Sequence, residues 1–236
     1  MKLFRTLRQN YIKEGNIKKY LLYAVGEIFL VMIGISLAFQ LDNWNERRVK
    51  RVSEVRFYEN IKEQIADDKA LILQQVDFNN YFLANSKYLN NIIEANDRSK
   101  LDSIGPLVRD LLQYSDFDKE ANIYQTLINS GEVKLLQNHE IVNGIREIEE
   151  KYNYANRMEN IHFVAMMNHV ALTVNSLVKF SSGEIKNPDG MYDYQFQNLI
   201  ISLMNIMTEK DKAYHEALNE IEIVTELINQ ELETNN

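Results

Sequence analysis

Hydrophobic residues follow two different patterns along the chain, and the two patterns predict two kinds of helix. Residues 21–41 form a single apolar run in which Glu27 and Gln40 are the only strongly polar side chains. About 20 apolar residues cross the hydrocarbon core of a bilayer, so we expect a transmembrane helix over residues 20–44. The run is longer than the apolar region of a signal peptide, and we therefore interpret it as an anchor that is not cleaved.

After residue 44 the apolar residues recur at helical spacing instead of forming an unbroken run. The first such stripe consists of Tyr58, Ile61, Ile65, Ile72, Val76 and Leu83. Stripes of this kind bury one face of a helix against a neighbour, and the low content of 8 Gly and 2 Pro favours helix throughout. We therefore predict an all-α protein in which the transmembrane helix is followed by a soluble domain, residues 45–236, that forms an elongated antiparallel helical bundle.

Turn-forming residues divide this domain into its expected helices. The breaks are NDRSKLDSIGP at 96–106, Ser130-Gly131, and SSGEIKNPDG at 181–190. Gly tolerates the left-handed conformation that ends many helices, and Asn-Pro and Asp-Gly favour tight turns. The helices predicted between these breaks cover residues 45–95, 106–114, 118–129, 138–180, 192–208 and 210–233.

Charge is distributed unevenly between the two ends of the chain. Residues 1–56 hold 11 Lys or Arg and 5 Asp or Glu, whereas the rest of the chain carries a net charge of −14. The basic part suits an anionic lipid surface, and the acidic part repels nucleic acid, so we expect membrane lipid and no nucleic acid as a partner. We interpret residues 1–19 as a basic cytoplasmic leader, either a short interfacial helix or a disordered tail.

The direction of the span follows from the same charges. Positively charged residues flank it on both sides, but those after it are diluted by Asp42, Glu46 and Glu54. Positive flanks stay in the cytoplasm, and large downstream domains translocate with little regard for charge. We expect a single-pass protein of the bacterial inner membrane with a cytoplasmic N-terminus and a periplasmic body.

One carboxylate interrupts the apolar run and raises the question of its environment. On a helix, Glu27 shares a face with small residues, and the predicted helix-contact seam is Ala24, Glu27, Val31, Gly34 and Ala38. Small residues let two helices approach closely, and a carboxylate in this face favours a helix partner over lipid. Two alternatives remain open: Glu27 is neutral or reaches the headgroups, or it takes part in ion coupling.

Two stretches resemble a known family. YAVGEIFLVMIGISLAFQLDNWNE, within residues 23–46, and YQTLINSGEVKLLQN, residues 124–138, resemble motifs of a family of uncharacterised single-span bacterial membrane proteins. The resemblance implies the anchor and the helical body, but it implies no activity. It marks Gly26, Glu27 and an interface motif consisting of Asn43, Trp44, Asn45 and Glu46 as residues of interest.

Candidate chemistry is sparse. Met158, His162, Met166 and His169 share one side of a helix and could hold copper, although the same spacing describes an ordinary core stripe. Glu159-Asn160-Ile161-His162 matches one half of a di-iron motif, but the chain has no second Glu-x-x-His. No nucleophile motif or phosphate-binding loop is present, and we expect no catalytic residues, no metal and no cofactor.

These features favour one function over two others. The leading interpretation is a membrane-anchored helical scaffold or accessory subunit that mediates protein–protein assembly, as a homo-oligomer or with another membrane protein. The first alternative is a sensor whose helical bundle lies outside the cytoplasm. The second is a single-span subunit of a proton-coupled membrane complex that uses Glu27, which is an analogy of layout only.

Overall fold

The computed structural model describes residues 17–117 and 123–234 of the chain. Most of these residues are helical, and their strands are limited to one pair of two residues each, which confirms the predicted all-α fold. They divide into two units, one ending at Glu54 and one beginning at Val55. Most of the predicted leader at 1–19 lies outside the described residues.

Helix α2 (Ile17–Glu94) supplies the predicted span and the first helix of the bundle. From Ala24 onward it contains a stretch that is long and apolar enough to cross a membrane, and none of that stretch is buried. This single exposed apolar helix is compatible with one membrane span, as predicted for residues 20–44.

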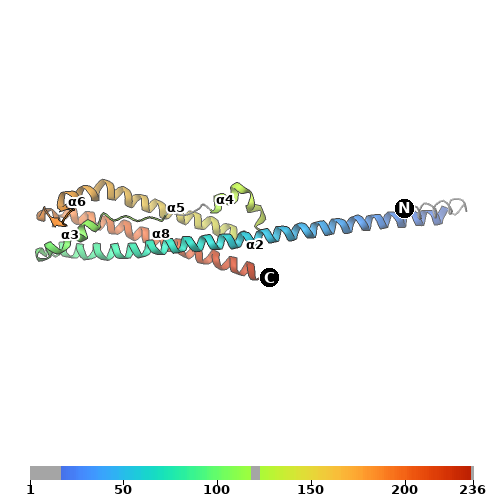
Figure 1. The fold of residues 1–236 in the computed structure, drawn as a ribbon, viewed down its shortest axis with the longest axis horizontal. Helices are drawn as coiled ribbons and strands as arrows, with labels where there is room; N and C mark the ends of the chain where they lie inside the picture. The colour runs from blue at the N-terminus through green and yellow to red at the C-terminus, as the bar shows by residue number, and fades with distance from the viewer. Residues whose placement is uncertain (1–16, 118–122, 235–236) are drawn as a thin grey trace. The chain divides into compact units, whose positions relative to one another are not determined.

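The second unit is a bundle built around three long helices (Figure 1). They are the part of α2 after Glu54, α5 (His139–Ala165) and α8 (Tyr194–Glu233). Lys62 of α2 donates a hydrogen bond to Asn229 of α8, and Lys69, seven residues later on α2, donates one to Glu222. Glu222 lies seven residues before Asn229, so the chain runs in opposite directions along the two helices. Helix α8 is therefore antiparallel to α2, and the predicted antiparallel bundle is confirmed.

Shorter elements connect these helices. They are η1 (Arg98–Lys100), α3 (Leu101–Asp110), α4 (Ile123–Ser130), η2 (Glu132–Leu135), a π-helical turn η3 (Met166–Val170), α6 (Ala171–Leu177), β1 (Val178–Lys179), β2 (Glu184–Ile185) and α7 (Pro188–Met191). Gly131, at φ 76°, follows α4 as the predicted helix stop. Asn138 then caps α5 by accepting hydrogen bonds from the backbone N–H groups of Glu140 and Ile141.

The bundle has two apolar core clusters along its length. The first contains Tyr58, Ile61, Ile65, Ile72 and Val76 of α2, together with residues of α5 up to Ala155 and of α8 from Ala213 onward. The second contains Phe82, Leu89, Ile92 and Ile93 of α2, together with Met166 and residues of α8 up to Met207. The predicted stripe of α2 supplies the first cluster from Tyr58 to Val76, and its last member, Leu83, packs against the second.

Three predicted boundaries are wrong. Helix α3 begins at Leu101, before Gly105-Pro106. Gly105 serves as a close contact and not as a break, because a Cβ there would clash with the backbone oxygen of Gly183. The expected helix at 138–180 is divided by η3 and ends in the β1–β2 pair. The expected helices at 192–208 and 210–233 are one helix, α8, since neither Gly nor Pro interrupts them.

Candidate functional site

A layer of polar side chains separates the two core clusters, and we call it the polar belt. It consists of Asn79 on α2, Glu159 and His162 on α5, and Lys210 and the Tyr214 hydroxyl on α8. On each helix the belt residues lie at the junction between the two clusters, as Asn79 does between Val76 and Phe82. The bundle therefore has ionisable groups where its two apolar clusters meet, in addition to Asp68 and Glu149, which are buried within the first cluster.

Lys210 is the cation of the polar belt, and its side chain is 0% exposed. Its Nζ donates a hydrogen bond to the backbone oxygen of Ser115 at 2.6 Å. The same atom lies 5.6 to 5.8 Å from the ring centroids of Phe78, Tyr114 and Tyr214, a range at which cations are attracted to aromatic faces. Burial lowers the pKa of Lys210 to about 8, although the charges of Glu159 and Asp116 oppose the shift.

Glu159 is the acidic residue of the belt. Its Oε1 accepts a hydrogen bond from the Tyr214 hydroxyl and another from the backbone N–H of Phe117, at 2.6 Å. Burial raises the pKa of Glu159, and these two hydrogen bonds and the charge of Lys210 oppose the increase. An opposite charge and two donors together keep a carboxylate in an interior that would otherwise exclude it.

His162 is the least satisfied member of the belt. It is fully buried, and neither ring nitrogen has a hydrogen-bond partner among the described residues. Its ring packs against those of Tyr114 and Phe82, with centroids 5.4 and 5.8 Å away. Burial, followed by the nearby charge of Lys210, lowers the pKa of His162 to about 4, so the ring is neutral at pH 7.

The segment after α3, residues 111–117, closes the belt on one side, and we call it the strap. In Figure 1 it runs back along the bundle from the end of α3. Besides its bonds to Lys210 and Glu159, it is tied to α2 by the Ser115 hydroxyl, which donates to Oε1 of Gln75 at 2.6 Å. The strap thus has contacts with all three long helices.

A groove of about 410 Å³ lies beside the strap. Its lining consists of Tyr114, Asp116, Phe117, Asn156, Glu159, Asn160 and Phe163. The Tyr114 and Phe163 rings meet edge to face in its wall, with centroids 5.4 Å apart. Glu159 connects this groove to the belt, because it lines the one and belongs to the other.

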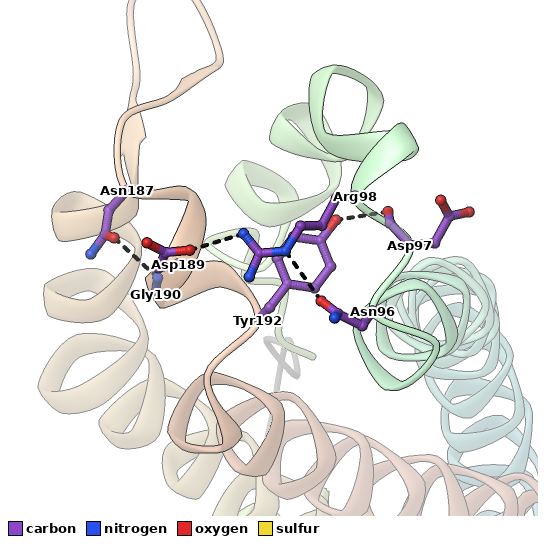
Figure 2. A network of polar contacts seen from close by, with 7 residues as sticks. All are labelled: Asn96, Asp97, Arg98, Asn187, Asp189, Gly190 and Tyr192. Atoms are coloured by element: carbon purple, nitrogen blue, oxygen red, sulfur yellow. Dashed lines mark hydrogen bonds and ion pairs between the residues drawn. The ribbon is translucent and has the colours of Figure 1, made fainter.

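A second polar network, which we call the clasp, joins the end of α2 to the loop before α8 (Figure 2). The Arg98 guanidinium donates to Asn96 at 3.3 Å and to Asp189 at 2.9 Å, and it lies 4.9 Å from the centroid of the Tyr192 ring. The Tyr192 hydroxyl donates in turn to the backbone oxygen of Asp97 at 2.8 Å. Asn96, at φ 48°, lets the chain turn out of α2 at this point.

The predicted seam and interface motif lie on α2 in the first unit. Helical geometry places Ala24, Glu27, Val31, Gly34 and Ala38 along one face, and a Cβ added at Gly34 would meet nothing within 4 Å. In the interface motif, Trp44 is exposed and the Arg48 guanidinium lies 6.0 Å from its ring centroid. Glu46 pairs with Lys50 at 2.7 Å, and this hydrogen bond lowers the pKa of Glu46.

Sequence reasoning singled out two belt residues, Glu159 and His162, as parts of possible metal-binding patterns while expecting no metal, and it did not identify Asn79 and Lys210. His162 and Met166 are buried as a common face predicts, but the π-helical turn that begins at Met166 changes the phase of the helix and leaves His169 exposed. The sequence contains one indication that Lys210 is buried: it occupies a core position in the apolar stripe of α8, between Met207 and Tyr214.

The comparisons with known proteins yield a family and no activity. A family model described as a family of unknown function, DUF6090, matches residues 27–207. No curated protein and no solved structure matched the chain. The matched region includes most of the predicted span, the interface motif, the strap and the belt residues of α2 and α5, and it ends before Lys210 and Tyr214. Because the match covers more than half of the 236 residues, the chain belongs to the DUF6090 family.

Proposed function

We propose that this protein is a membrane-anchored helical scaffold or accessory subunit that assembles through its span, first of all with copies of itself. The observation that carries the proposal is the accessibility of the seam: the apolar stretch of α2 that holds it is unburied, and a Cβ added at Gly34 would meet nothing within 4 Å. Lipid chains would cover the larger apolar residues. A face of small residues that includes a carboxylate is better covered by a second helix.

The proposed placement is a single pass through the bacterial inner membrane, with the leader in the cytoplasm and the body in the periplasm. The uneven charge of the chain supports this direction. Protease added to intact spheroplasts should degrade the body, whereas a fully protected body would mean that the topology is reversed.

Native mass spectrometry of the detergent-extracted full chain tests the assembly. We expect discrete homo-oligomers for the natural sequence and a shift toward monomer for Glu27→Gln and for Gly34→Leu. Ile33→Leu is the matched control. It changes the shape of the side chain next to Gly34 but outside the seam, and it should leave the oligomer intact. Unchanged oligomers in both seam variants, or monomers in every sample, would contradict the proposal.

A sensor is the second candidate, and the polar belt is the observation that favours it. A buried lysine, glutamate and histidine at one level give the bundle an element whose charge state affects three helices and the strap at once. In this alternative the body responds to a ligand or to pH outside the cytoplasm, and a partner protein receives the signal.

A further inference from the structure

The groove beside the strap is rich in acceptors that have no donor. Glu159 is only 4% exposed, yet it lines the groove and uses one oxygen, Oε1, for both of its hydrogen bonds. Its Oε2 accepts none from the residues that the structure describes. Asn156 presents the same situation, because its buried Oδ1 has no partner in the described part of the chain.

The rest of the lining indicates which ligand would supply donors. Asp116 adds a second carboxylate, and Tyr114, Phe117 and Phe163 add three aromatic rings. Carboxylates and ring faces both attract cations, and the net charge of −14 over residues 57–236 raises the local concentration of cations further. A hydrated metal ion would gain little from the rings, whereas an organic cation can contact rings and acceptors together.

We propose that this groove binds a small organic cation that carries a primary ammonium group. Such a group has three N–H donors, which suit Oε2 of Glu159, Oδ1 of Asn156 and the Asp116 carboxylate, and its alkyl part can lie against the Tyr114 and Phe163 rings. A volume of about 410 Å³ falls in the range of small-molecule sites. The proposal does not depend on assembly through the span.

Lys210 provides an internal precedent for this chemistry. Its ammonium group, next to the groove, already lies near three rings and within the field of Glu159 and Asp116. The ligand would repeat this arrangement on the open side of the same carboxylate. Because Glu159 also holds the backbone of Phe117, an occupied groove would be linked to the strap.

Isothermal titration of the detergent-solubilised full chain with putrescine, at pH 7, tests the proposal. We expect saturable binding of putrescine and none of 1,4-butanediol, which has the same length but no charge. Asp116→Asn and Phe163→Leu change exposed residues and should each weaken binding at least about fivefold. Glu63→Gln, which removes one exposed carboxylate from α2 outside the groove, is the matched control and should bind as the natural sequence does.

Several outcomes would overturn the proposal. They are the absence of putrescine binding at millimolar concentration, equal binding of the diol, or equal affinity in the two groove variants and the control. Binding of calcium chloride in place of putrescine would also overturn it, because the class of ligand would then be wrong. None of these results would change the oligomeric state, so failure of this proposal is distinct from failure of the assembly proposal.

Discussion

The polar belt and the clasp are both networks of charged and aromatic side chains, but they differ in burial. In the belt, Lys210 and Glu159 are 0% and 4% exposed. In the clasp, the side chains of Arg98 and Asp189 are 52% and 91% exposed. Water screens the clasp and can replace any partner that it loses, whereas the interior of the bundle offers a belt residue no such substitute.

The difference in burial means that losing a similar contact has a different effect on stability in the two networks. Losing one partner in the clasp leaves a solvated group, and exposed ion pairs contribute about 0 to 1 kcal/mol. Losing one partner in the belt leaves an uncompensated charge between two apolar clusters. The belt is therefore the place where a single substitution or a change of pH should affect the whole bundle.

The largest expected effect is that of Glu159→Leu. It removes the carboxylate that compensates the buried Lys210 and should lower the free energy of unfolding by about 3 to 5 kcal/mol. Urea unfolding of the full chain in detergent, followed by far-UV circular dichroism, measures the change. The single Trp44 lies outside the bundle, so its fluorescence is not a suitable probe.

A double variant separates charge from packing. Adding Lys210→Met to Glu159→Leu removes both groups, and we expect it to recover part of the loss, since apolar residues can replace two buried groups of opposite charge at little cost. If the double variant were as unstable as the sum of the two single variants, the belt would not act as a coupled pair.

The next effect is a pH dependence that His162 causes. The pKa of His162 is lowered from 6.5 to about 4 in the fold, so its contribution to stability is complete above pH 6.5 and is lost as the pH falls through 4. The loss should reach about 3 kcal/mol. The raised pKa of Glu159 acts in the opposite direction, since its contribution to stability grows with acidification.

Comparison with His162→Leu isolates the histidine. The natural sequence should lose stability relative to this variant between pH 6.5 and 4, and urea unfolding at several pH values measures the difference. At pH 7 the variant should be no less stable, because it removes two unpartnered nitrogens. Parallel stability curves over the whole range would contradict the prediction.

The smallest effect belongs to the clasp. Arg98→Lys keeps the charge but loses the planar group that faces Tyr192, and we expect a decrease of less than about 1 kcal/mol in the free energy of unfolding. The same urea experiment, repeated in 0.5 M sodium chloride, should reduce the effect further. A loss as large as that of Glu159→Leu would invalidate the contrast between the two networks.

The fold was more predictable than the site, and particular residues show why. Stripes such as Tyr58–Ile61–Ile65 indicated helices and their buried faces, because helical periodicity is a local property of the chain. The belt required four segments far apart in the sequence: α2, the strap, α5 and α8. Ser115 has nothing in its own neighbourhood that indicates a hydrogen bond from Lys210, 95 residues later.

The sequence by itself determined the helical class, the single apolar stretch, the uneven charge and the family motifs, because each depends on composition or on residues a few positions apart. Only the tertiary structure decided that Lys210, Glu159 and His162 share one level of the bundle, that the strap covers them and that a groove opens beside them. The physical reason is that a buried charge is tolerated only through partners in space, and the packing of the helices selects those partners.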